Sequence, residues 1–104
     1  VAGHIAQARR RLAQVSEAAA RWDRLEALVD DRGWPDRLVI ALDQSLVGGT
    51  GRGRFGEEAE VSVATASADF RRLLDAGLVE QRGKGRSTRY FASERLREAV
   101  VLRS

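Results

Sequence analysis

The feature that most constrains the fold lies near the C-terminal end, where residues 73–91 read LLDAGLVEQRGKGRSTRYF. Gly77 can take the left-handed conformation that closes the last turn of a helix. The apolar pair that follows it begins an extended run, two closely spaced glycines mark a turn, and the residues up to Phe91 are again β-prone. The stretch predicts a helix end, a strand, a tight turn and a second strand.

The predicted turn is cationic. Between Gln81 and Ala92 there are four positive side chains and no acid. These four are Arg82, Lys84, Arg86 and Arg89. A two-stranded flap with a positive tip, directly after a short amphipathic helix, is the layout of a winged helix-turn-helix. That layout suits a helix in the DNA major groove and a wing on the adjacent phosphates.

The length and composition of the chain limit the classes of protein to which it can belong. A chain of 104 residues forms one domain, or one small domain with an extension. A hydrophobic content of 43% supports a core, and a charged content of 32% argues against a membrane protein. The absence of cysteine excludes disulfides and thiolate metal sites, and it is compatible with the cytoplasm. The charges of residues 1–47 cancel, so the net charge of +3 comes from residues 48–104 and predicts a nucleic-acid-binding surface there.

A long helix is expected first, over about residues 4–32, because no Gly or Pro interrupts it and apolar residues recur at spacings of three and four. The stripe comprises Ile5, Ala8, Leu12, Val15, Ala19 and Trp22, and continues in Leu25, Leu28 and Val29. A compact domain covers only its second half, so the first half is expected to face a second copy or another part of a parent protein. We therefore divide the chain into a linking helix, 1–33, and a winged helix-turn-helix domain, 34–104.

The middle of the chain predicts a second helix and a glycine-rich connector. Gly33-Trp34-Pro35 breaks the first helix, and the second begins near Asp36. Its expected buried face is Leu38, Val39, Leu42 and Leu46. Residues 47–53 (VGGTGRG) lack the Gly-Lys-Ser/Thr ending of a phosphate-binding loop and are interpreted as a flexible connector.

Two further helices are expected around this connector and the wing. A short helix over 54–59 turns Phe55 and Ala59 inward, and Ser62 caps a third core helix over 63–76. The buried stripe of that third helix is Ala66, Phe70, Leu73 and Leu74, which leaves Asp69 among the residues of its other faces. Ser93 is expected to cap a final helix over 94–102, with Leu96 and Val100 inward. The fold class is mainly α with a small β-hairpin, a winged helix-turn-helix preceded by a long N-terminal helix.

Candidate DNA-contacting residues follow from this layout. On the third core helix, Thr65 and Ser67 lie near the start and suit base edges, with a thymine methyl as one target of Thr65. Arg71 and Arg72 lie farther along and suit phosphates. In the wing the candidates are Arg82, Lys84, Arg86, Thr88 and Arg89. Gly85, between Lys84 and Arg86, allows the backbone to approach the duplex.

The sequence gives less support to a catalytic or metal-binding site than to a DNA-binding surface. His4 is the only histidine and sits at a helix start, so neither a general base nor a transition-metal site is expected, and no cofactor is implied. The acids Glu57, Glu58 and Glu60 are interpreted as a solvated face. Trp22 and Trp34 are assigned to the core because both lie on or beside apolar stripes, and the run of arginines at 9–11 to the solvated side of the long helix.

The chain resembles the C-terminal winged helix of Fic-family proteins. The resemblance covers most of residues 12–92. It rests on a pattern formed by Ser62, Thr65, Ala66, Asp69, Phe70, Leu73, Gly77 and Leu78, followed by GKGRSTRY at 83–90 and preceded by ARWDR at 20–24. The family's catalytic motif, His-Pro-Phe-x-x-Gly-Asn-Gly-Arg, is absent, and Ala68 stands where relatives often carry Arg. The resemblance implies a non-catalytic regulatory module whose full-length parent is a nucleotidyltransferase.

The function predicted from these observations is binding of double-stranded DNA in the bacterial cytoplasm, for transcriptional regulation or targeting, without a membrane. An alternative is a protein-interaction or dimerisation module that regulates the missing N-terminal catalytic domain, with a homodimer formed through the long helix. An independent transcriptional regulator is a third alternative. It keeps the DNA contact but has no parent enzyme.

Overall fold

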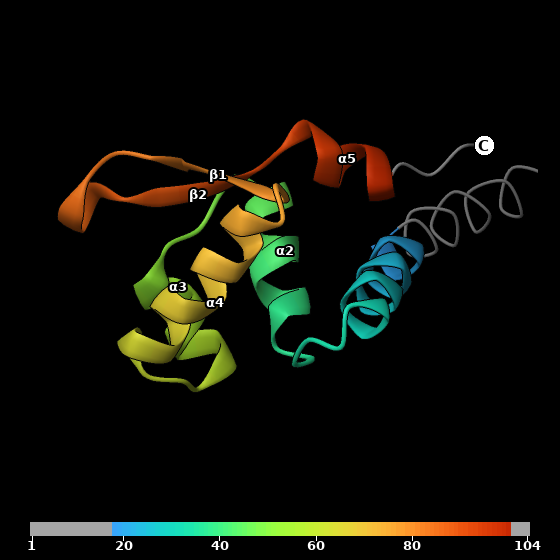
Figure 1. Ribbon diagram of the computed structural model, residues 1–104, viewed down its shortest axis with the longest axis horizontal. Coiled ribbons are helices and arrows are strands. Elements are labelled where there is room, and N and C mark those ends of the chain that lie inside the picture. Colours follow the sequence, from blue (N-terminus) through green and yellow to red (C-terminus); the bar gives the residue numbers. More distant parts are fainter. Residues whose placement is uncertain (1–17, 101–104) are drawn as a thin grey trace, which may run out of the picture.

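The computed structural model describes residues 18–100 (Figure 1). Residues 18–31 are helical, and we call them the N-terminal helix. They are followed by α2 (Leu38–Leu46), α3 (Arg52–Ala59), α4 (Val63–Asp75), β1 (Val79–Arg82), β2 (Arg89–Ala92) and α5 (Glu94–Val100). Within residues 18–100 the helix pair α3–α4 leads directly into the β1–β2 hairpin, which is the arrangement of a winged helix-turn-helix and confirms the predicted fold class. His4, the arginines at 9–11 and the first half of the predicted long helix lie outside the described residues.

The two strands form the wing. They pair antiparallel from Val79 opposite Ala92 to Arg82 opposite Arg89, and a single 3₁₀ turn, Gly85–Ser87, lies at the tip. The wing projects from one end of the molecule and the N-terminal helix lies at the other (Figure 1). The predicted order of helix end, strand, basic turn and strand is confirmed.

An aromatic stack joins the wing to the helices. The ring of Phe70 on α4 stacks parallel on Tyr90 of β2 with centroids 4.0 Å apart, and meets Phe55 of α3 edge-on at 5.3 Å. Such pairs add about 1 kcal/mol each beyond the area they bury. Leu25 and Val29 of the N-terminal helix are fully buried in the same core. The stack therefore fixes β2 relative to α3 and α4.

The predicted caps are present. Ser62 Oγ accepts a hydrogen bond from the backbone N–H of Thr65 at 3.1 Å. Ser93 Oγ accepts from the N–H of Leu96 and donates to the carbonyl of Gly77 at 2.6 Å. Gly77 has the expected left-handed conformation, with φ of 73°. One serine thus caps α5 and also holds the end of α4 beside it.

Residues 47–51 form the predicted loop between α2 and α3, but the loop is tied to the wing and is not a flexible connector, and residues 52 and 53 belong to α3. Thr50 is fully buried and forms a β-bridge with Tyr90, with N–H to O distances of 2.9 and 2.7 Å, and its hydroxyl donates to Gln44. Gly49 lies under the ring of Phe91, where an added Cβ would come within 2.5 Å of a ring carbon. α3 then begins at Arg52, two residues earlier than predicted. Thr50 therefore adds a one-residue antiparallel bridge alongside β2 of the wing.

Two burial predictions also fail. Asp69, assigned to the outer faces of its helix, is only 3% exposed because it forms an ion pair with Arg37. Trp22, assigned to the core, is 39% exposed, because it lines an open hollow of about 250 Å³ between the N-terminal helix, α2 and α3 instead of packing tightly against them. Trp34 is half-buried and packs against the core as expected.

Smaller differences concern helix ends and edges. Asp36 lies in a turn before α2, and Leu46 and Leu74 are half-buried at the edge of the core. The predicted inward residues Leu38, Val39, Leu42, Phe55, Ala66, Phe70, Leu73, Leu96 and Val100 are buried.

Candidate nucleic-acid interface

A basic groove lies between the tip of the wing and the first turns of α3 and α4. Its volume is about 690 Å³. The lining residues are Gly51, Arg52, Gly53, Arg54, Val63, Gly85, Arg86, Ser87, Thr88 and Arg89. Four of them are arginines and none is an acid. A concave surface with one sign of charge concentrates counter-ions, so this groove attracts a polyanion. We call it the basic groove.

Arg52 connects the three parts of the basic groove. Its Nη2 donates to the carbonyl of Gly85 at the wing tip at 3.3 Å, and its Nη1 lies 3.5 Å from the hydroxyl of Ser67 on α4. The planar guanidinium can donate in two directions at once, which a lysine cannot do. Arg52 therefore holds the wing tip at a set distance from the outer edge of α4.

The stem of the wing carries a like-charge pair. Arg82 and Arg89 stand directly opposite each other in the ladder, so their side chains leave the same face. Like charges in that relation destabilise a hairpin. Arg82 lies over the ring of Phe91 at 4.6 Å and approaches exposed Glu80 only to 3.8 Å. An anion placed between the two arginines would relieve their repulsion.

The outer face of α4 changes character along its length. Ala64 and Ala68 are exposed on the first two turns, and Arg71 and Arg72 are exposed on the third. Thr65 is half-buried and its hydroxyl accepts from Ser62 at 3.1 Å. The small residues at the start of α4 would allow a nucleic acid to approach the helix closely. The arginines at the far end are placed where side chains typically contact a phosphate backbone.

The predicted site residues are distributed over this surface. Arg86, Thr88 and Arg89 line the basic groove, and Ser67 reaches it through Arg52. Thr65, Arg71 and Arg72 lie on α4, and Arg82 and Lys84 are exposed on the wing outside the groove lining.

Several residues that line the groove were not predicted as site residues, and the three of them with the largest side chains are Arg52, Arg54 and Val63. The two arginines fall in or beside the glycine-rich stretch that was interpreted as a connector. Their two positive charges among glycines were the available signal, but their position beside the wing depends on the pairing of Thr50 with Tyr90.

A partly buried ion pair anchors the opposite face of α4. Arg37 Nε donates to Asp69 Oδ2 at 2.7 Å and its Nη2 to Oδ1 at 3.0 Å. The hydrogen bond to Asp69 raises the pKa of Arg37 above its ordinary value, and the charge of Asp69 acts in the same direction against the effect of burial. The fork fixes the rotation of α4 about its axis, and thereby which residues it presents outward.

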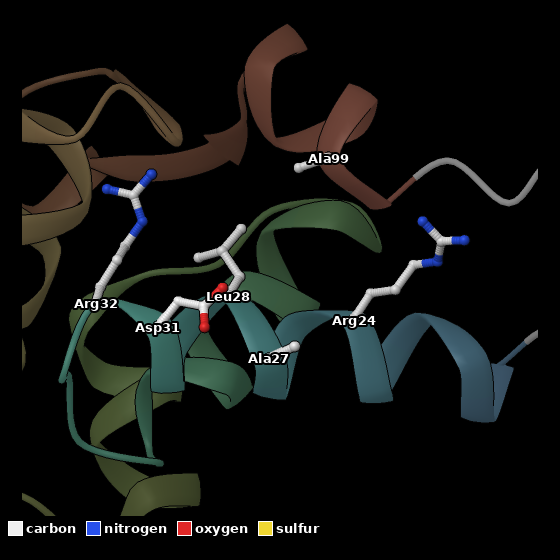
Figure 2. A pocket seen from close by; sticks show the side chains of 6 residues that line it. All are labelled: Arg24, Ala27, Leu28, Asp31, Arg32 and Ala99. Atoms are coloured by element: carbon white, nitrogen blue, oxygen red, sulfur yellow. The ribbon is translucent and has the colours of Figure 1, made fainter.

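A second hollow, of about 510 Å³, lies between the N-terminal helix and α5 (Figure 2). Leu28 and Ala99 point into it from the two helices, and Arg24 and Arg32 flank it with Asp31 between them. Arg32 also lies over the ring of Trp34, 5.1 Å from its centroid. We call this hollow the rear crevice. Its lining has two arginines and one acid, whereas the lining of the basic groove has four arginines and no acid.

Within residues 18–100, no group of three or more His, Cys, Asp or Glu side chains is arranged to hold a metal ion. None of the helices described in that range is both long enough and apolar enough to cross a membrane.

The fold is similar to that of several solved structures. A MarR family protein from Bacillus stearothermophilus shares 17% identity with a TM-score of 0.58, over 96% of this chain and 71% of that one. A MarR family regulator from Neisseria meningitidis shares 14% with a TM-score of 0.56, over 92% and 66%. A MarR family transcriptional regulator from Streptomyces coelicolor shares 22% with a TM-score of 0.51, over 96% and 70%.

No protein-family model and no curated protein matches the chain. The likeness to these structures is therefore one of fold, and the predicted membership of a Fic-family protein finds no support among them.

Proposed function

We propose that this chain binds double-stranded DNA and acts in transcriptional regulation. The observation that carries the proposal is the basic groove, in which four arginines and no acid face the first turn of α4. In a winged helix-turn-helix this is the side that meets a duplex, with the helix in the major groove and the wing along the backbone. The names of the structurally similar regulators support the same function.

In this proposal the contacts divide by residue type. Arg86 and Arg89 bind phosphates from the wing, and Arg71 and Arg72 bind them from the far end of α4. Thr65 and Ser67 stay proposed as base-edge contacts near the start of α4, and Arg82, Lys84 and Thr88 as wing contacts.

The test is a salt titration of binding to random duplex DNA, followed by fluorescence anisotropy. Replacing both Lys84 and Arg86 with Ala removes two phosphate contacts, so the slope of log K against log salt should fall by about 1.8. A matched control replaces Arg24 and Arg97, two exposed arginines on the N-terminal helix and α5, and should leave the slope unchanged. Equal slopes for the two double variants would count against the wing contact.

A second function is favoured by one observation. The side of the N-terminal helix that carries Ala19 and Trp22 is exposed, although both belong to its apolar stripe. We propose that this side packs on a second copy or on a catalytic domain of the parent protein. Sedimentation of the wild type beside Trp22→Ser tests the first arrangement, since self-association that survives the substitution contradicts it.

The Fic relationship, with residues 1–33 as the linking helix, is proposed on the sequence pattern alone. The coding sequence upstream of Val1 tests it. A His-Pro-Phe-x-x-Gly-Asn-Gly-Arg motif there supports a parent nucleotidyltransferase, and an open reading frame without that motif contradicts it.

A further inference from the structure

Val63 is an apolar side chain placed in a polar groove. It is the first residue of α4, it is 62% exposed, and it lines the basic groove beside the wing tip. It is not among the apolar side chains that pack on the core. Of the large hydrophobic residues exposed within 18–100, the other two, Trp22 and Val47, lie outside that groove. Burial in the fold therefore does not explain the position of Val63.

The surroundings of Val63 hold it in place. Ser62 caps the helix through the N–H of Thr65, which fixes the backbone of the first turn. A β-branched side chain on a helix has one strongly preferred rotamer, so its two methyl groups point in one direction. Ser67, four residues on, lies on the same edge of the helix, with its hydroxyl 3.5 Å from Nη1 of Arg52.

Apart from Val63, the first turns of α4 offer a base edge only short side chains. Ala64 contributes one methyl group, and the hydroxyl of Thr65 is bonded to Ser62. No charged or amide side chain occurs among residues 62–68. This helix tip therefore offers short hydroxyls and methyl groups, and the apolar group that a methyl can meet on the floor of the major groove is the 5-methyl of thymine.

We propose that Val63 reads sequence by packing its methyl groups against the 5-methyl of a thymine when α4 enters the major groove. The inference rests on the proposed DNA-binding function and adds a specificity-determining residue to it. The arginines of the basic groove carry the sequence-independent attraction, and Val63 makes an A·T pair preferred at the position it meets.

The test compares two duplexes of roughly 20 bp, two helical turns. One is alternating dA·dT and the other is the same sequence with deoxyuridine in place of thymidine, which removes the 5-methyl and leaves every phosphate and base pair in place. Every base pair of the first duplex carries a thymine methyl group, so the protein meets one wherever it binds. The natural operator sequence therefore need not be known. The wild type should bind the methylated duplex roughly threefold to fourfold more tightly, the effect of burying one methyl-sized group.

Two variants assign the effect. Val63→Ser should bind both duplexes equally, and it should fold normally because the side chain is exposed. Val47→Ser removes a side chain of equal size that is 59% exposed in the turn after α2, and it should keep the wild-type preference. Dividing the wild-type preference for the methylated duplex by the preference of each variant cancels any effect of a difference in stiffness between the two duplexes.

The outcomes separate the two proposals. Equal binding of both duplexes by the wild type overturns the thymine contact and leaves DNA binding standing. A preference of unchanged size in Val63→Ser also overturns it, since another residue or the stiffness of the duplexes then accounts for the preference. Failure of the wild type to bind either duplex at low salt overturns DNA binding and this inference together.

Discussion

Arginine is used in opposite ways on the two sides of α4. On the inner side Arg37 makes a forked contact with Asp69, a carboxylate that is 4% exposed. On the outer side the four arginines of the basic groove meet no acid in its lining. A paired, partly desolvated arginine stabilises the fold, whereas an unpaired exposed one contributes little to stability and remains available to an anion.

This comparison also separates the two hollows. The basic groove draws its cations from α3 and the wing, and one of them, Arg52, bridges to α4. The rear crevice has Asp31 between Arg24 and Arg32, and Arg32 is engaged with Trp34 (Figure 2). Charge and geometry thus favour the wing side of the molecule for a polyanion.

The largest expected effect is on the inner side. Asp69→Ala removes two charge-assisted hydrogen bonds from Arg37, which stays about a third exposed to water, and should lower the free energy of unfolding by about 2 kcal/mol. Urea denaturation followed by circular dichroism measures the change. Glu80→Ala, which removes an exposed ion pair with Arg82, is the control and should change stability by less than about 0.5 kcal/mol. Similar losses for the two variants would remove the distinction between the inner and outer arginines.

An intermediate effect is expected at the bridge. Arg52→Lys keeps the charge but loses the fork that reaches both Ser67 and Gly85, so DNA affinity should fall by about fivefold, or roughly 1 kcal/mol, at constant salt slope. Anisotropy titrations at several salt concentrations separate the two quantities. If the slope of log K against log salt falls together with the affinity, Arg52 is instead a direct phosphate contact.

The smallest effect sharpens the comparison on the wing. Arg89→Gln removes the like charge opposite Arg82, so the free energy of unfolding should rise by about 0.5 kcal/mol. The same change should reduce the salt slope of DNA binding by about 0.9, one phosphate contact. Thermal unfolding and titration on one preparation test both parts. A variant that is less stable, or that binds with the wild-type slope, contradicts the idea that Arg89 is placed for DNA at the expense of the fold.

Much of the architecture was predictable because its signals are local. The cap at Ser62, the left-handed closure at Gly77 and the basic turn of the wing each depend on residues a few positions apart. Chain-local rules of periodicity and capping describe such elements well. The wing residues Arg86, Thr88 and Arg89 were predicted for the same reason, and their roles in binding stay predictions.

The amino-acid sequence by itself determined the order of helices, the hairpin and the positive charge at its tip, since these follow from the backbone preferences and charges of neighbouring residues. Only the tertiary structure decided that Asp69 turns inward to Arg37, 32 positions away, and that Arg52 reaches Gly85, 33 positions away. It also decided that Thr50 pairs with Tyr90 and that Trp22 stays uncovered. The reason is physical: an ion pair or a β-bridge between distant segments depends on where packing brings them together, and periodicity within a segment carries no record of that.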